Sequence, residues 1–192
     1  VTWGRSSAKD NYAWIDLDNE KSIEILMQRL YDFGHRKIGF LNVHQSFNYG
    51  YQRKNAYKEF HKNKNIKLNS EYYQESLDHA TVTGISLSKK LLDLKDPPTA
   101  IICSLDKYFI GCLQECQRRG LVIAKDISVV GYNDQDNYLS SQNVTYISHP
   151  LAEMGKMAIK MLEQLDQGEK PENLSKLIKP ILNKGKSDGK VS

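Results

Sequence analysis

The sequence predicts an α/β protein in which helices cover both faces of a parallel sheet. Short apolar runs with the length of strands alternate along the chain with longer segments whose apolar residues repeat at helical spacing. Several runs are mostly apolar, such as 127–131 with Ile127, Val129 and Val130, which is typical of a parallel strand buried on both faces. Alternation of this kind is the pattern of βαβ units, so the expected fold is a parallel sheet sandwiched by helices.

The first helix carries the clearest local signals. A short strand over 13–16 precedes it, and the segment 20–33 places its apolar residues on one face. Asp18 is a candidate N-cap, and Gly34 stands where a left-handed C-cap residue belongs. The elements that follow are strand 37–42, helix 51–62, strand 71–76, helix 81–94, which Pro97 and Pro98 bring to an end, and strand 99–104.

The second half of the chain repeats the alternation. Helix 107–119 ends at Gly120, and strand 127–131 is followed by a further strand over 144–148. Helix 151–166 spaces Met154 and Met161 for burial, and one last strand is expected over 177–182.

Composition narrows the classes of function. The chain has 192 residues, a formal net charge of +4 and no apolar stretch near the roughly 18 residues that span a bilayer. The first residues do not resemble a signal peptide, and three cysteines give no paired disulfide framework, so a cytoplasmic location is expected. Cys112 and Cys116 lie one helical turn apart and could share a metal, but no further ligand follows at suitable spacing, so both are interpreted as small core residues. We therefore expect no cofactor and no metal.

Basic residues are spread rather than clustered. The lysines of the C-terminal region are not interleaved with aromatic residues, whereas nucleic-acid binding needs a basic face or a groove-reading motif. These lysines are typical of a solvated surface: Lys176, Lys179, Lys184, Lys186 and Lys190.

Polar side chains follow several of the predicted strands, at the points where those strands end. The most conspicuous group is "GYNDQDN" at 131–137, directly after a buried-type strand. In open α/β sheets ligands bind beyond the carboxyl ends of strands, although a solvated turn would give the same residues. Arginine, amide and carboxylate groups grip adjacent hydroxyls, and flat rings cover the apolar face of a sugar. The candidate site residues are Tyr49, Arg53, His79, Asn133 and His149, with Asp106 and Asp134 in support.

Each candidate also has an ordinary structural interpretation. Asp106 would serve as the N-cap of helix 107–119. His79 and His149 would be exposed loop residues, and Arg53 would be a surface cation. These alternatives remain open at the level of residue pattern.

Catalytic motifs are lacking. The chain has no G-x-G-x-x-G after a strand, no G-x-S-x-G and no H-E-x-x-H. The "NKGKS" stretch at 183–187 lacks the earlier glycine of a phosphate-binding loop, because position 180 is Pro. No enzyme class is therefore indicated.

Three stretches in fixed order carry a family resemblance. They are "DNEKSIEILMQRLYDFGHRKIGFLN" at 18–42, "PPTAIICSLDKYFIGCLQECQRRGLVIAKDISVVGYNDQD" at 97–136 and "VTYISHPLAEMGKMAIKML" at 144–162. Together they resemble the LacI/GalR family of bacterial transcriptional regulators over residues 14–187. The stretch "VTWGRSSAKDNYAWIDLDN" also resembles family members that respond to sugars.

The resemblance implies a core like that of type I periplasmic binding proteins, with two α/β lobes and an effector between them. It implies a complete C-terminal lobe at 18–148 and 170–185, remnants of the N-terminal lobe at 1–17 and 149–169, and a tail at 186–192. The family's helix-turn-helix headpiece and most of the N-terminal lobe would precede residue 1, so the chain is expected to be truncated there.

The resemblance also implies roles for individual residues. Arg53 matches the family's ligand-clamping arginine, and Asn133 matches an aspartate that accepts hydrogen bonds from ligand hydroxyls. An amide can donate as well as accept, so hydroxyl binding is retained. Tyr49, His79 and His149 match variable positions that line the ligand pocket. Leu105 stands where the family has a polar Asn, which puts one hydroxyl contact in doubt.

The implied function is sensing rather than catalysis. The chain would be the ligand-sensing domain of a LacI-type DNA-binding regulator, with a small effector, expected to be a sugar, modulating operator binding. The parent would be a homodimer that reaches operator DNA through its headpiece and does not bind membranes. The alternatives are a sugar-binding protein of an ABC importer, which shares the fold, and a small α/β enzyme.

Overall fold

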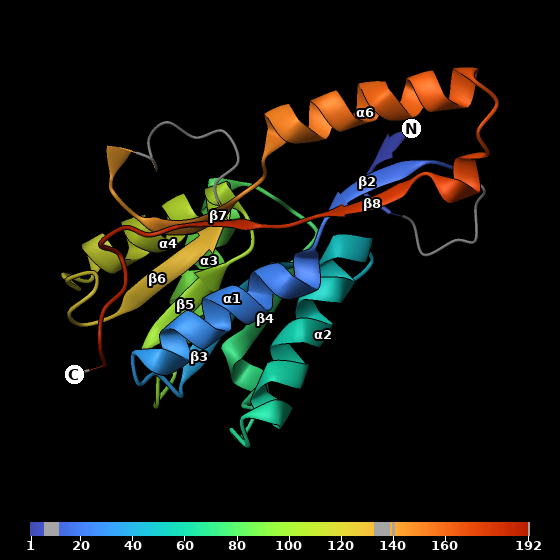
Figure 1. The fold of residues 1–192 in the computed structure, drawn as a ribbon. Helices are drawn as coiled ribbons and strands as arrows, with labels where there is room; N and C mark the ends of the chain where they lie inside the picture. Colours follow the sequence, from blue (N-terminus) through green and yellow to red (C-terminus); the bar gives the residue numbers. More distant parts are fainter. Residues whose placement is uncertain (6–11, 133–138, 140, 192) are drawn as a thin grey trace.

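Two parallel-rich sheets and five α-helices make up the described part of the chain, which is residues 1–5, 12–132, 139 and 141–191 of a computed structural model (Figure 1). The larger sheet has six strands: in spatial order β4 (Tyr73–Ser76), β3 (Ile38–Val43), β5 (Ala100–Cys103), β6 (Ser128–Tyr132), β7 (Thr145–Ser148) and β9 (Ile181–Asn183). The smaller sheet has the order β1 (Thr2–Trp3), β2 (Trp14–Leu17) and β8 (Ser175–Ile178). The predicted α/β class is confirmed.

The larger sheet is covered on both faces, as its apolar strands require. Helices α1 (Asn19–Asp32) and α2 (Asn48–Asn63) lie on one face, and α3 (Thr81–Leu92) and α4 (Asp106–Arg118) lie on the other (Figure 1). Side chains alternate along each strand, so Phe40 packs toward α1 and α2 while its neighbour Leu41 packs toward α3 and α4. A fully buried strand such as β3 is therefore apolar almost throughout.

The smaller sheet packs beneath the last helix. Helix α6 (Leu151–Asp166) lies along β2 and β8 in Figure 1, and it shares an apolar cluster with them. Met154 and Met161 are buried there against Ile15, as their spacing predicts. No helix of the described residues combines the length and the apolar character needed to cross a bilayer.

Local signals set the ends of the helices. The Asp18 carboxylate accepts a hydrogen bond from the backbone N–H of Lys21 at 2.8 Å, and Gly34 has φ +94°, so both predicted caps of α1 are confirmed. The predicted N-cap at Asp106 is wrong by one residue. Leu105 is the cap, and Asp106 is the first helical residue, with its carboxylate accepting from the N–H of Lys107 at 2.7 Å.

The single strand predicted over 177–182 is also wrong. The structure has two strands there, β8 and β9, and Pro180 lies between them. β8 pairs with β2 in the smaller sheet, whereas β9 pairs with β7 in the larger sheet. Among the described strands of the larger sheet, the β7–β9 pair is the one antiparallel pair. Proline breaks the strand because it lacks a backbone N–H for the ladder. This segment therefore joins the two sheets.

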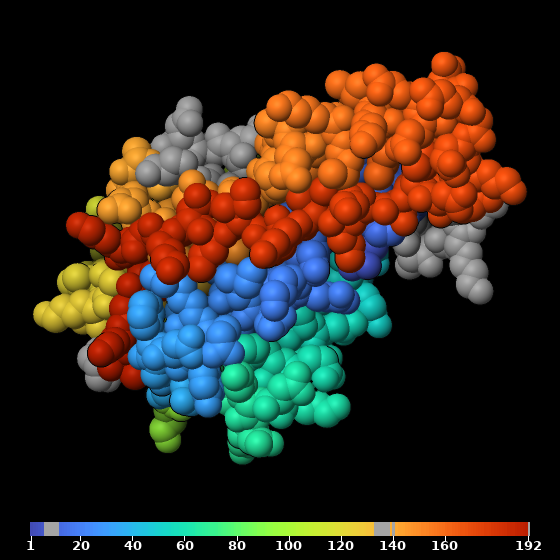
Figure 2. Space-filling view, viewed as in Figure 1, coloured from blue at the N-terminus to red at the C-terminus, as the bar shows by residue number. Residues whose placement is uncertain are grey.

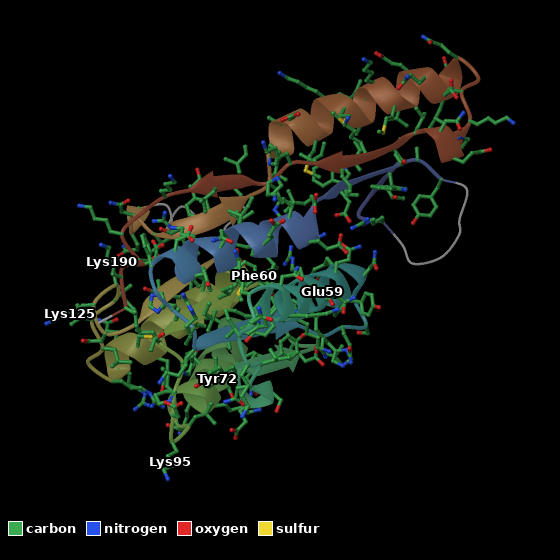
Figure 3. All side chains as sticks on the ribbon, turned by 60° about the horizontal axis from the view of Figure 1, so that its bottom comes forward. Glu59, Phe60, Tyr72, Lys95, Lys125 and Lys190 are labelled. Carbon is green, nitrogen blue, oxygen red and sulfur yellow. The ribbon has the colours of Figure 1, made fainter. Side chains whose placement is uncertain are left out.

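The last residues, 185–191, are fixed to the larger sheet and α1. Ser187 accepts a backbone hydrogen bond from Val129 at 2.8 Å, and the imidazole of His35 contacts the carbonyl oxygen of Gly189 at 3.0 Å. Asp188, whose side chain has no exposed surface, pairs with Arg29. Figure 2 shows the last residues in the deepest red at the edge of the molecule, next to the blue of α1. In Figure 3, Lys95, Lys125 and Lys190 project at the end of the molecule away from the smaller sheet.

Candidate functional site

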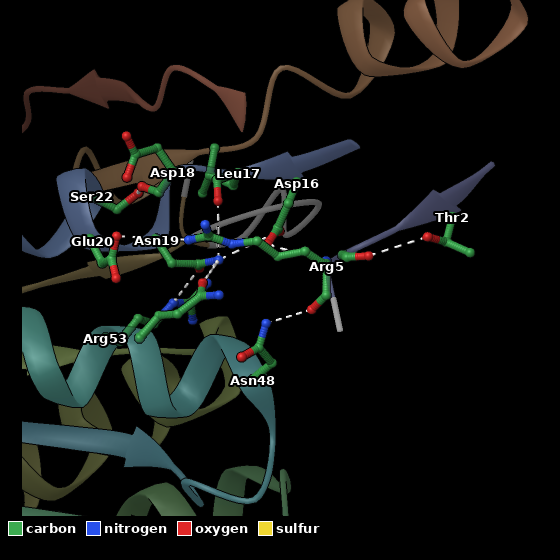
Figure 4. A network of polar contacts seen from close by, with 12 residues as sticks. Thr2, Arg5, Asp16, Leu17, Asp18, Asn19, Glu20, Ser22, Asn48 and Arg53 are labelled. Carbon is green, nitrogen blue, oxygen red and sulfur yellow. Dashed lines mark hydrogen bonds and ion pairs between the residues drawn. The ribbon is translucent and has the colours of Figure 1, made fainter. Parts of the chain in front are cut away.

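A cavity of about 240 Å³ lies where the smaller sheet meets the carboxyl end of the larger one. Its walls come from the end of β2, the starts of α1 and α2, and the segments that follow β5 and β7. The lining residues are Asp16, Asn19, Tyr49, Arg53, Ser104, Leu105 and His149. Figure 4 shows the polar network on one side of this cavity.

Arg53 is the central cation of the cavity and is only 4 % exposed. Its Nε donates to Asn19 Oδ1 at 2.8 Å, and its Nη1 donates to the carbonyl oxygen of Ser104 at 2.8 Å. The guanidinium carbon lies 3.9 Å from the ring centroid of Tyr132 and 5.2 Å from that of Tyr49. Two hydrogen bonds and two aromatic faces therefore fix the plane of the guanidinium before any ligand arrives.

Asn19 connects Arg53 to the smaller sheet. Its side-chain amide donates to the Leu17 carbonyl and to Gln52 Oε1, at 3.1 Å each, and it lies 3.5 Å from Asp16 Oδ1. With its amide oxygen accepting from Arg53, Asn19 is 1 % exposed and fully engaged. Figure 4 shows Asn19 between Asp16 and Arg53. The start of α1 thus holds the cleft arginine in place.

Asp16 contributes a buried carboxylate from strand β2 of the smaller sheet. It is 9 % exposed, and its nearest cation is Arg5, with Arg5 Nε 3.5 Å from Asp16 Oδ2. The backbone N–H of Arg5 also donates to that oxygen, at 3.4 Å. Desolvation raises the pKa of Asp16 above its ordinary value, against the lowering effect of Arg5. The carboxylate is therefore held with long, weak contacts.

Aromatic and imidazole rings complete the lining. Tyr49 lies one helical turn before Arg53 on α2, so both side chains reach the same side of the helix. Burial raises the pKa of Tyr49, which keeps its hydroxyl protonated and able to donate. The His149 ring lies 6.4 Å from the ring of Tyr132, at the end of β7.

The structure brings together three of the predicted site residues. Arg53, Tyr49 and His149 line one cavity, and the interpretation of Arg53 as a surface cation is wrong because the side chain is buried. His79 does not line this cavity. Its ring packs 5.2 Å from that of Phe47, and its Nε2 has no hydrogen bond among the described residues. Asp106 lies outside the lining, and Asn133 and Asp134 fall outside the described residues.

Several lining residues were not predicted. Asp16 and Asn19 lie in the stretch "WIDLDN", where the pattern indicated only a strand end and a cap. A polar residue flanked by apolar residues within a strand was the signal for Asp16. Ser104 contributes mainly its backbone carbonyl, for which side-chain patterns give no signal.

Other parts of the described chain are less suited to chemistry. Two larger hollows, of about 500 and 370 Å³, lie along the outer face of α1 and are lined mostly by charged surface side chains. The three cysteines are buried in the core, which agrees with their interpretation as packing residues. No group of three or more possible metal ligands occurs among the residues that the structure describes. The cleft beside Arg53 therefore remains the candidate site.

Comparison with known proteins identifies the family. The family described as a periplasmic binding protein-like domain matches residues 27–187, so the chain belongs to that family. The relatives that match it are LacI-family regulators, which confirms the resemblance seen in the sequence. The ribose operon repressor of Haemophilus influenzae is 36% identical over 138 residues, which are 70% of this chain and 41% of that protein.

Solved structures agree with the fold. A protein described as a transcriptional regulator from Yersinia pestis biovar Microtus matches with a TM-score of 0.90 at 29% identity, covering 99% of this chain and 68% of that one. A regulatory protein of the LacI family from Chloroflexus aggregans has a TM-score of 0.87 at 26% identity, over 97% of this chain and 67% of its own. The chain spans about half the length of the curated relatives it matches, at 46%, 41% and 48% for three of them.

Proposed function

We propose that this chain is the ligand-sensing domain of a LacI-type transcriptional regulator and that it binds a small sugar beside Arg53. The observation that carries the proposal is a buried guanidinium, held at 2.8 Å by Asn19 and by the Ser104 carbonyl, at the wall of a cavity between two sheets. A buried cation held in a fixed orientation at a cavity wall is suited to ligand binding.

The lining suits a polyhydroxylated ligand. Hydroxyl groups donate and accept, so they can pair both with the carboxylate of Asp16 and with the donors of Arg53 and Tyr49. The flat faces of Tyr49 and His149 can cover the apolar side of a sugar ring. A relative named for the ribose operon supports a sugar as the effector class. Asn133 remains a proposed contact of the same ligand, whereas His79, which does not line this cavity, is not proposed as a contact.

The two sheets suggest a division into lobes. We assign 18–148 to one lobe and 1–17 with 149–169 to the other, which follows the larger and smaller sheets. Strand β8 would belong with the smaller lobe because it pairs with β2, and 179–185 would return to the larger one through β9. The cavity would then lie between the lobes, where closure could enclose a ligand.

In the parent protein, ligand binding would modulate operator binding by shifting populations between lobe arrangements. Operator DNA would be contacted by a separate part of the parent, which would act as a homodimer in the cytoplasm and without enzymatic activity. The relatives reported above are regulators, which supports this function over a sugar-binding protein of an ABC importer. Dimerisation and a cytoplasmic location are proposed from membership of this family.

Ligand-observed NMR on the 192-residue chain tests the proposal. Neutral pentoses, hexoses and disaccharides are screened at millimolar concentration, which detects dissociation constants on the order of 1 mM, about −4 kcal/mol. At least one sugar should bind, and Arg53→Ala should weaken it by about 1.5–3 kcal/mol, or about 10–150-fold.

Matched variants separate loss of binding from loss of folding. Lys54→Ala removes a cation from the next position of α2, outside the cavity lining, and should leave affinity unchanged. Arg53→Lys keeps the charge but loses the planar donor set, so it should also weaken binding. Equal affinity in wild type, Arg53→Lys and Arg53→Ala, with all three folded by circular dichroism, would refute the site.

A further inference from the structure

The guanidinium of Arg53 is already committed to the protein. Nε is bonded to Asn19 and Nη1 to the Ser104 carbonyl, and the Tyr132 ring lies against one face of the plane. An arginine often binds a phosphate with two neighbouring N–H groups, one of which is the Nε–H. For Arg53 to bind in this way, the hydrogen bond from its Nε to Asn19 would have to break. Asn19 is itself fixed by Leu17 and Gln52, so this rearrangement would break a connected network.

Asp16 places a negative charge in the same cavity. Arg53 and Asp16 are the only Arg, Lys, Asp or Glu side chains among the lining residues that the structure describes. Arg5 partly balances Asp16, but its closest approach is 3.5 Å and it pairs also with Glu20 at 3.8 Å. Burial raises the pKa of the Asp16 carboxyl, because desolvation outweighs the lowering effect of Arg5 and Arg53. Among the described lining residues one guanidinium is thus matched by one carboxylate, so the formal charges of these two groups leave no surplus of positive charge.

We propose that Asp16 is a specificity residue, which makes this cleft select an uncharged polyhydroxylated ligand over the phosphorylated or carboxylated form of the same compound. The inference rests on the proposed function and names its ligand class. A ligand hydroxyl can donate to the Asp16 carboxylate, whereas a phosphate or carboxylate lacks that proton and brings a like charge beside it. Like charges placed together across an interface are strongly disfavoured, so we expect discrimination of at least about tenfold.

The experiment compares matched pairs of sugars on the full 192-residue chain. Ribose is compared with ribose 5-phosphate, and glucose with glucose 6-phosphate and glucuronate, by ligand-observed NMR at constant ionic strength. In wild type the neutral member of a binding pair should bind at least about tenfold more tightly. In Asp16→Asn the ratio should fall toward one, because the neutral sugar loses a strong acceptor and the anion no longer meets a like charge.

Glu24→Gln is the control variant. It removes the same charge from α1, but Glu24 is exposed, pairs with Lys21 rather than with Arg5 and lies outside the cavity lining, so the wild-type ratio should persist. Thermal unfolding of each variant confirms that it is folded, and Asp16→Ser provides a second way to remove the charge.

The outcomes separate this inference from the proposed function. If a phosphorylated or carboxylated member binds as tightly as its neutral partner, the ligand-binding function stands and the inference alone is overturned. The same holds if Asp16→Asn and Asp16→Ser leave the ratio unchanged. If no neutral or charged sugar binds at all, the proposed function fails and the inference falls with it.

Discussion

Replacing Asp188 with Asn should loosen the C-terminal segment from the larger sheet. The Asp188 side chain has no exposed surface, while that of its partner Arg29 is 18% exposed. Arg29 Nη2 donates to one carboxylate oxygen at 3.2 Å, and the Thr145 hydroxyl donates to the same oxygen at 2.5 Å. The substitution keeps the shape of the side chain and one acceptor but leaves the guanidinium without its counter-charge.

The size of the effect follows from burial. Removing one partner of a fully buried ion pair costs about 3–5 kcal/mol, because the other charge stays buried and unpaired. Water still reaches part of Arg29, so we expect a loss of about 2–3 kcal/mol in the free energy of unfolding. For a domain of this size that corresponds to a decrease in Tm of about 4–12 °C.

Urea denaturation followed by circular dichroism measures this loss, and a second ion pair provides the comparison. Asp96 pairs with Lys37 at 2.6 Å, but their side chains are 70% and 43% exposed, so Asp96→Asn should cost no more than about 1 kcal/mol. A cost below about 1 kcal/mol for Asp188→Asn, or one equal to that of Asp96→Asn, would refute the argument from burial.

Three further predictions concern pH and packing. Burial lowers the pKa of His35 below 6.5, so the unfolded chain binds more protons than the folded chain near that pH. The free energy of unfolding should therefore fall as the pH drops through 6.5. In urea titrations at several pH values, His35→Gln should reduce this dependence on pH. Hydrogen bonding from Arg118 lowers the pKa of Glu115 from 4.5 to about 2. The ionised Glu115 should therefore stabilise the fold fully above pH 4.5, and this contribution should disappear as the pH falls toward 2. Glu115→Gln should flatten this dependence of the free energy of unfolding on pH. Gly111→Ala would place a Cβ 2.4 Å from a carbonyl oxygen of α3 and should lower the free energy of unfolding by about 1–3 kcal/mol. The new Cβ in Gly155→Ala meets nothing within 4 Å, so this variant should stabilise α6 by about 0.5–1 kcal/mol. Thermal unfolding that ranks the two variants the other way would contradict the packing argument.

The elements themselves could be predicted because their signals are local. Helix α6 spans Leu151–Asp166, which are the residues predicted from apolar spacing, and α1 has both predicted caps. Strand β3 is buried at every position, and its apolar run gave its location to within a residue. Burial on a helix stripe or on both faces of a strand constrains residue types within a single element, so the pattern survives without knowledge of the partners.

Sheet membership could not be predicted, because it depends on distant partners. The residues of 177–182 are apolar on both sides of Pro180, and nothing local distinguishes a strand of the smaller sheet from one of the larger sheet. The proline could have indicated two strands rather than one, since it interrupts a hydrogen-bonded ladder. The choice of β2 and β7 as their neighbours is a property of the whole fold.

The candidate site was only half predictable, and two buried polar residues explain why. Asp16 in β2 and Asn42 in β3 are both flanked by apolar strand residues, so the sequence treats them alike. Asn42 is fully buried and donates to the Gly50 carbonyl at 2.8 Å, which fixes the start of α2. Asp16 instead faces the cavity, because β2 turns Ile15 toward α6 and the next side chain toward the larger sheet. A buried polar residue in a strand therefore indicates that a partner exists, and the elements packed against that strand decide whether its side chain meets the protein's own backbone, as Asn42 does, or faces a cavity, as Asp16 does.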